Sequence, residues 1–226
     1  MSAARSTGER KTVAVFDLDG TLTRYDAFVR FLLGSLLRTP ARWRHIPALV
    51  MAVAASAMGR RDRTWLKTRF LRLVLAGVPS ETMERRVNEF VAGLVRGGLR
   101  AGALAQVEAH RAAGDAIVLA TASPDVYATT VSGRLGIETV LCTVTERDER
   151  GRLTGALVGS NCHGPEKVRR LHELLGSERD DVWVVAYSDH HSDLPVLLWA
   201  DKGVAVSPTP TLARAAAERG LRVALW

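Results

Sequence analysis

The sequence predicts an α/β protein with a doubly wound parallel sheet, into which a helical segment is inserted. Short apolar runs without alternation recur along the chain, which is typical of strands buried on both faces of a parallel sheet. From residue 101 onward these runs alternate with helical patterns. Between the first and the second run lie roughly seventy residues of helical pattern, whereas a simple crossover between parallel strands needs little more than a dozen.

The length and composition are those of an ordinary globular protein. The 226 residues suffice for a large hydrophobic core, and 47% hydrophobic and 24% charged residues are typical values. Two cysteines, Cys142 and Cys162, make neither a disulfide framework nor a metal cluster, and they favour a cytoplasmic location. The polar start predicts no secretory signal, and we expect a flexible leader over residues 1–10.

The first apolar run, Val13–Phe16, ends at two acidic residues, Asp17 and Asp19. Gly20 permits a tight turn, and Thr21 offers a hydroxyl to a phosphate or to the backbone. Because open α/β sheets bind ligands at the carboxyl ends of their strands, we expect the two carboxylates to line a crevice. Asp17 can attack phosphorus and Asp19 can act as general acid and then base. An acidic turn built from common turn residues is the alternative for this stretch alone.

Four helices are expected in the inserted segment. Asp26 and Asp62 can cap the first and the third, and Gly97 and Gly98 close the fourth. The helices are expected over residues 27–37, from near Pro40 through 43 to 58 with a kink or break at Pro47, over 62–75 and over 80–95.

The inserted segment is strongly basic. Residues 24–100 contain fifteen Arg or Lys and five Asp or Glu, a net charge of +10 in a chain with a total of +7. The segment could attract an anionic substrate, acidic lipid or nucleic acid, and dispersed solvated arginines are the alternative. Residues 48–58 are apolar but too few for the roughly twenty that span a bilayer. We expect a helix buried in the segment there, with contact to a membrane surface left open.

After residue 100 the chain alternates between helix and strand. Helices are expected over residues 101–113, 125–135, 165–175 and up to 200, and strands over 116–120, 139–145, 153–158 and 182–187 and around 204, with a hairpin turn at 149–152. No glycine-rich dinucleotide or P-loop fingerprint is present.

Polar side chains at the ends of four elements suggest one phosphoryl-transfer site. Asp17 and Asp189 can bind Mg²⁺, which suits one or two carboxylates together with a substrate phosphate. Asp193 could be a further ligand or orient a metal-bound water. Lys167 can offset negative charge in the transition state, and Thr121 can donate to a phosphate oxygen. Taken singly, each residue also fits a helix cap, a loop or a solvated surface position.

Together these motifs resemble the haloacid dehalogenase superfamily. The resemblance rests on Asp-Leu-Asp-Gly-Thr at 17–21, on Thr121, on Lys167, and on Asp189 and Asp193 four residues apart. Within the superfamily the chain looks like subfamily IB, the phosphoserine-phosphatase-like group, and the helical segment looks like a C1 cap.

The resemblance implies a role for each matching residue. Asp17 is the nucleophile and Asp19 the acid/base, whose backbone carbonyl binds the metal. Asp189 is a metal ligand that Asp193 supports, and Thr121 and Lys167 hold the phosphoryl group. Phosphoserine phosphatases carry Glu nine residues after the nucleophile, where it meets the substrate amino group; that place is Asp26 in this sequence.

The sequence therefore predicts a Mg²⁺-dependent phosphomonoester hydrolase for a small anionic metabolite. We expect a discontinuous core over residues 11–24 and 100–226 and a helical cap over 25–99. Lys67, Arg69 and Arg72 of the cap are candidates for binding a second anionic group of the substrate. No nucleic-acid partner and no transmembrane segment are expected. A phosphatase or phosphotransferase acting on lipid or protein, and a non-catalytic basic binding module, are the alternatives.

Overall fold

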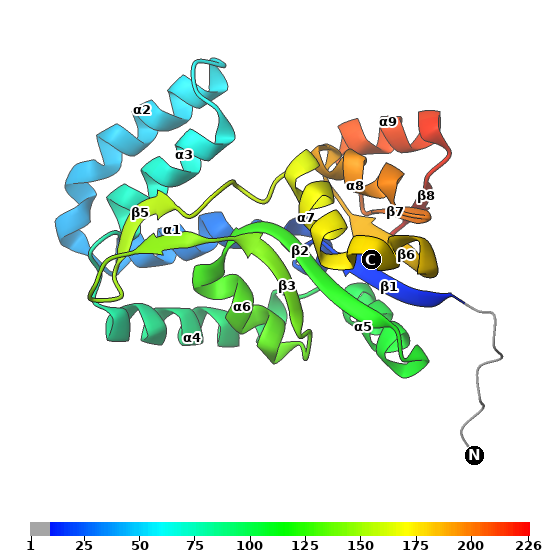
Figure 1. Cartoon of the computed structure of the whole chain (residues 1–226). Coiled ribbons are helices and arrows are strands. Elements are labelled where there is room, and N and C mark those ends of the chain that lie inside the picture. The colour runs from blue at the N-terminus through cyan, green and yellow to red at the C-terminus, as the bar shows by residue number, and fades with distance from the viewer. Residues whose placement is uncertain (1–9) are drawn as a thin grey trace.

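The computed structural model describes residues 10–226, so most of the predicted leader lies outside the described part of the chain. A six-stranded sheet forms the centre, with the strand order β3-β2-β1-β6-β7-β8 and every neighbouring pair parallel (Figure 1). Its strands are β1 (Lys11–Phe16), β2 (Ala116–Pro124), β3 (Thr139–Thr143), β6 (Val182–Ser188), β7 (Lys202–Val206) and β8 (Arg222–Ala224). The predicted fold class is confirmed.

β1 lies at the point where the strand order reverses. Its residues pair with β2 on one side and with β6 on the other, for example Phe16 with both Leu119 and Tyr187. The chain leaves β1 toward one half of the sheet and later returns to build the other half beside it. In open α/β sheets this is where a crevice opens outside the carboxyl ends of the strands.

Helices cover both faces of the sheet and bury two hydrophobic cores. Alternate residues of β1 point to opposite faces, so that Ala14 and Phe16 join one core and Val13 and Val15 the other. Helices α7 (Pro165–Leu175), α8 (Leu194–Trp199) and α9 (Pro210–Arg219) cover the second core. Helices α4 (Ser80–Gly97), α5 (Ala101–Ala113) and α6 (Asp125–Arg134) cover the first.

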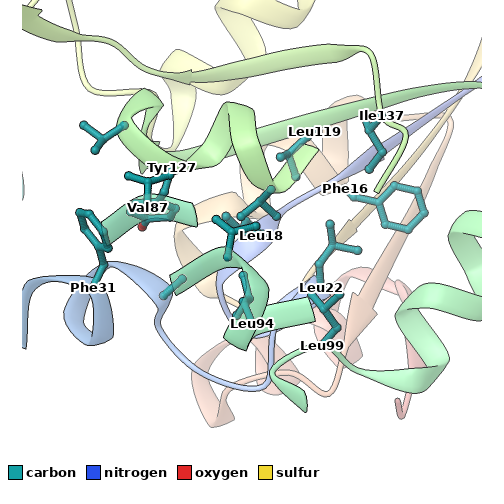
Figure 2. Close-up of a cluster of buried hydrophobic side chains, with 14 of the residues drawn as sticks. Phe16, Leu18, Leu22, Phe31, Val87, Leu94, Leu99, Leu119, Tyr127 and Ile137 are labelled. Carbon is teal, nitrogen blue, oxygen red and sulfur yellow. The ribbon is translucent and has the colours of Figure 1, made fainter. Parts of the chain in front are cut away.

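The first core extends into the inserted helical segment, which consists of α1 (Ala27–Leu37), α2 (Ile46–Ala57), α3 (Arg63–Phe70) and α4. Figure 2 shows Phe31 and Val87 of this segment beside Tyr127 of α6. The Phe31 and Tyr127 rings have centroids 5.2 Å apart, and Phe90 lies 5.4 Å from Tyr127. Such aromatic contacts each contribute about 0.5–1.5 kcal/mol beyond the burial itself.

The helix boundaries follow the predicted caps closely. The Asp26 side chain accepts from the Val29 amide and begins α1, and the Asp62 side chain accepts from the Trp65 amide and begins α3. The predicted break near Pro47 is found, because a 3₁₀ segment (Pro40–His45) precedes α2 and Pro47 lies in its first turn. A proline there needs no amide partner.

One prediction for the helical segment is corrected. The apolar stretch of α2 is not a buried helix, since only Leu49 and Ala52 of its residues are buried. The third helix reaches Leu75 as predicted, as an α-helix over Arg63–Phe70 and a π-helical turn over Leu71–Leu75.

A two-stranded antiparallel hairpin, β4 (Thr145–Arg147) and β5 (Leu153–Leu157), packs against the helical segment (Figure 1). The Gly77 amide donates to the Leu153 carbonyl, and the α-carbon of Gly155 lies against the Arg72 backbone. A Cβ at Gly155 would lie 2.4 Å from the Arg72 Cα, so this approach requires glycine. That residues 25–99 form a separate cap stays a proposal. In this proposal the hairpin is packed on the cap and belongs with it.

Within residues 10–226, no helix is both long enough and apolar enough to span a membrane.

Candidate active site

The turn after β1 places two aspartates at the crevice. The backbone amide of Asp17 donates to the Tyr187 carbonyl and so continues the β1–β6 pairing to the last residue before the turn. The chain then reverses through Gly20, at φ +79°. A Cβ on Gly20 would lie 2.2 Å from an Asp189 carboxylate oxygen. Glycine is thus needed here for its conformation and for the space that Asp189 occupies.

Lys167 joins two of the predicted carboxylates in a buried ion-pair network. Its Nζ lies 2.7 Å from Asp17 Oδ1 and 2.6 Å from Asp193 Oδ2. Ser188 Oγ donates to the same Asp193 oxygen at 2.8 Å. Lys167 is only 2% exposed, and although burial lowers its pKa, the charges of Asp17 and Asp193 outweigh burial and raise the pKa overall. Lys167 therefore carries its charge inside the site.

The Thr21 hydroxyl lies between the carboxylates of Asp17 and Asp189. Thr21 Oγ1 lies 3.4 Å from Asp17 Oδ2 and 3.2 Å from Asp189 Oδ1, and it accepts from the Asp189 amide. Burial raises the pKa of Asp17 well above its usual value, against the opposing charge of Lys167, and burial also raises the pKa of Asp189. A buried carboxylate and a half-buried one that share one weak hydrogen-bond donor form a site that a cation would stabilise.

The residues fit a hard divalent cation. Among the described residues there is no group of three or more His, Cys, Asp or Glu side chains that could hold a metal by themselves. Mg²⁺ does not need one, because it typically keeps several waters and binds one or two carboxylates together with substrate phosphate. Asp17 and Asp189 could supply oxygen ligands of this kind, and Asp193 Oδ1 is buried without a hydrogen-bond partner among residues 10–226. These candidate ligand atoms are all oxygens, whereas zinc and copper sites are typically built from sulfur and imidazole nitrogen.

Asp19 has different surroundings from Asp17. Its Oδ1 accepts from the Ala27 amide at 2.6 Å and its Oδ2 accepts from Ser123 Oγ. Ser123 Oγ is in turn 2.6 Å from the Tyr127 hydroxyl, which must donate to Ser123 because Ser123 donates to Asp19. Burial raises the pKa of Asp19 to about 6, with Asp26 adding to the rise and the bonds from Ser123 and Ala27 opposing it. The Asp19 carboxylate is thus held by α1 and β2, and Tyr127 of α6 supports the Ser123 bond.

Thr121 and Asp26 do not contact these carboxylates directly. Thr121 is fully buried at the end of β2, and its hydroxyl accepts from the Ser123 amide at 2.9 Å. Asp26 lines the cavity but its carboxylate is engaged by the Val29 amide at 2.9 Å. The hydrogen bond to Val29 assigns Asp26 a helix-capping role.

The carboxylates open into a cavity of about 460 Å³ between the sheet edge and the helical segment. Lys67 of α3 reaches into it and donates to the Ala122 carbonyl and, at 2.5 Å, to Asn161 Oδ1. His163 also lines the cavity, and its Nε2 is buried without a partner among the described residues. Sequence reasoning named Lys67 only as one of several basic residues. It missed Asn161 and His163, although both lie in a polar stretch just before α7 and Lys167.

Arg69 and Arg72, the other two cap residues proposed for substrate binding, are not among the cavity-lining residues. Arg63, Arg24 and Arg100 line it instead. Arg100 Nε donates to the Gly20 and Thr23 carbonyls and thereby supports the turn that carries Asp19.

The fold and the site together define a class of enzyme. Carboxylates at the carboxyl end of the central strand, one buried lysine and a cavity covered by helices are suited to hydrolysis of an anionic ester. A family model described as haloacid dehalogenase-like hydrolase matches residues 14–198, and the chain belongs to this family. The predicted recognition and the predicted enzyme class are confirmed.

Relatives with assigned names are similar over most of the chain. Protein CicA of Caulobacter vibrioides is 34% identical over 200 residues, which cover 86% of each chain. Phosphoserine phosphatase SerB1 of Mycobacterium tuberculosis is 30% identical over 218 residues, 93% of this chain and 69% of SerB1. Among solved structures, a protein of unknown function from Bordetella pertussis Tohama I is 27% identical with a TM-score of 0.84, covering 95% of this chain and 98% of that one.

Proposed function

We propose that this protein is a Mg²⁺-dependent phosphomonoester hydrolase that forms an aspartyl-phosphate on Asp17 and acts on a small anionic metabolite in the cytoplasm. The observation that carries the proposal is the buried Lys167, which lies 2.7 Å from Asp17 Oδ1 at the floor of the cavity. A carboxylate can attack a phosphate only where positive charge offsets their repulsion. The similarity to SerB1, named a phosphoserine phosphatase, supports the same class of substrate.

The chain's own residues divide the reaction into two steps. An Asp17 oxygen attacks phosphorus while the bond to the ester oxygen breaks, and Asp19 gives its proton to the departing alkoxide. Water then attacks the aspartyl-phosphate, Asp19 takes up a proton from this water, and the bond between phosphorus and Asp17 breaks to release inorganic phosphate. Asp19 is positioned for both transfers by its bonds to Ala27 and Ser123.

The remaining residues stabilise charge and orient the reacting groups. Mg²⁺, when held by Asp17, Asp189 and the Asp19 carbonyl, supplies positive charge that offsets the phosphate oxygens. Lys167 contacts the same oxygens, and Asp193 positions Lys167 through their 2.6 Å bond. The Thr121 hydroxyl oxygen accepts from the Ser123 amide. In the proposed reaction the Thr121 hydroxyl proton donates to a phosphate oxygen. The helical segment over residues 25–99 covers the reacting groups and sets specificity.

A panel of phosphomonoesters tests this function. With Mg²⁺ present, we expect phosphate release from several small anionic esters, and phosphoserine belongs on the panel because of SerB1. Chelation of the metal should abolish release and added Mg²⁺ should restore it. A folded protein that releases no phosphate from any small ester, with or without metal, would contradict the proposal.

The position of Lys67 predicts a pH dependence of substrate binding. Burial lowers the pKa of Lys67 to about 8, although the Asp19 charge opposes this. Because the ammonium loses its proton above that pH, an anionic substrate is held less well, and KM should rise between about pH 7 and about pH 9. In Lys67→Met, KM should be about tenfold higher at neutral pH, with this rise absent. Arg69→Met is the matched control, and a KM slope that persists in Lys67→Met would contradict the assignment.

A further inference from the structure

Helix α2 exposes an outer face that is entirely uncharged. Successive residues of an α-helix are rotated by about 100° around its axis, so the residues of the outer face lie within an arc of about 160°. The outer face consists of Ile46, Pro47, Val50, Met51, Val53, Ala54 and Ala57. Val50 is 60% exposed and Met51 67% exposed. The solvent side of a surface helix is normally polar, so this face has the composition of a contact surface.

Four exposed arginines flank the outer face of α2. Arg44 precedes the helix, and Arg60, Arg61 and Arg63 follow it. Within residues 10–226 none of these four arginines forms an ion pair. The only acidic residue between positions 40 and 63 is Asp62, and its carboxylate caps α3. An uncharged face with one such arginine before the helix and three after it combines apolar contact with positive charge, and these are the two attractions that hold a helix at an anionic membrane surface.

The helix is placed so that a flat surface can reach it. Figure 1 shows α2 at the outer end of the helical segment, on the side away from the sheet. Its inner side packs through Leu49 and Ala52, which are buried. With 12 residues it is about 18 Å long, which fits a helix lying along a bilayer and is far too short to cross one.

We propose that the outer face of α2 docks on the surface of an anionic lipid bilayer, with the four arginines bound to lipid headgroups. Charge complementarity selects this occupant over a second copy of the chain. In a symmetric contact through α2 the same arginines would face one another without acidic partners, and like charges opposed at an interface disfavour it. One helix face of this length also offers only a few hundred Å², below the roughly 800 Å² per partner of a stable interface.

The docking surface is distinct from the reacting groups of the proposed site. None of the residues on the outer face of α2 lines the catalytic cavity. Arg63 alone belongs to both, since it lines the cavity and also follows α2. Variants of the outer face should therefore change membrane binding and leave hydrolysis of a soluble ester unchanged.

Vesicle flotation tests the proposal. We expect the full-length protein to float with phosphatidylcholine vesicles containing about one third phosphatidylglycerol, and to float at least about tenfold less with phosphatidylcholine alone or at high salt. The double variant Val50→Asp/Met51→Asp should lose binding to the anionic vesicles, and Arg44→Gln/Arg60→Gln/Arg61→Gln should weaken it. The matched control is Leu198→Asp/Leu225→Asp, because both leucines are exposed and lie elsewhere in the fold.

Three results would overturn the proposal. The first is a wild-type protein that does not float with the anionic vesicles. The second is an α2 variant that floats as well as the control. The third is a wild-type dimer in sedimentation equilibrium that Val50→Asp/Met51→Asp converts to a monomer, because the face would then be a contact between copies. Circular dichroism and thermal melting show that each variant compared is folded.

Discussion

Asp17→Asn is expected to abolish phosphate release while leaving the protein folded. The amide is nearly isosteric with the carboxylate but is no nucleophile toward phosphorus, so activity should fall by at least about 10⁴-fold. The fold should survive, because Asp193 remains 2.6 Å from Lys167 and keeps that charge paired. Steady-state phosphate release and thermal melting of the same preparation measure the two effects.

A chemical trap separates the nucleophile from a residue that merely binds. Acid quenching during turnover should leave a phosphoryl group on the peptide that contains Asp17 in the wild-type protein, and none on that peptide in Asp17→Asn. Asp26→Asn is the matched control, since Asp26 lines the same cavity but has its carboxylate bound to the Val29 amide. Substantial turnover by Asp17→Asn would contradict the proposed role of Asp17.

Much of the site was predictable because parallel strands end at one edge. Asp17 follows β1 and Asp189 follows β6, and the two strands are paired neighbours. Lys167 was grouped with them because it lies near the start of a helix, in the first turn, although taken alone it also fits a solvated surface lysine. Its burial depends on the fold of residues 150 positions away.

The contacts that sequence reasoning missed are those between distant segments. Lys67 meets Asn161 across 94 positions, and no local pattern encodes that distance. The hairpin turn at 149–152 was predicted, but the strand expected over 139–145 is divided: β3 stays in the six-stranded sheet and β4 pairs with β5. The packing of the hairpin against the helical segment depends on the close approach at Gly155. Helix α9 and strand β8 were not predicted, since the expected elements end at the short strand near Val204.

The exposure of α2 shows the limit of hydrophobicity as a guide to burial. An apolar stretch in a soluble fold normally indicates a core helix, because burial of apolar surface stabilises the fold by about 25 cal/mol per Å². The pattern in α2 lacks the polar positions that would mark an outer side, so periodicity could not distinguish a helix buried all round from one that exposes an apolar face. Only the tertiary structure shows that half of the residues of α2 are exposed.

Lys167→Met is expected to affect both activity and stability, unlike Asp17→Asn. Removing the buried cation leaves Asp17 and Asp193 without their ion pair, and breaking a buried pair by deleting one partner typically costs about 3–5 kcal/mol of unfolding free energy. Phosphate release should also fall by about 10²–10³-fold or more, the usual effect of losing one group that stabilises transition-state charge. Lys202→Met is the matched control at an exposed lysine, and its unfolding free energy should change by no more than about 0.5 kcal/mol.

The two effects of Lys167 can be separated by removing one of the stranded charges. In Lys167→Met/Asp193→Asn a single buried carboxylate, Asp17, remains, so part of the lost unfolding free energy should return in urea denaturation. Activity should not return, because the cation that meets the phosphate is still absent. If the double variant regained activity as well, Lys167 would act only as a structural partner of Asp193. If neither property changed in Lys167→Met, the buried network would have no role in the site, and the observation that carries the proposed function would be lost.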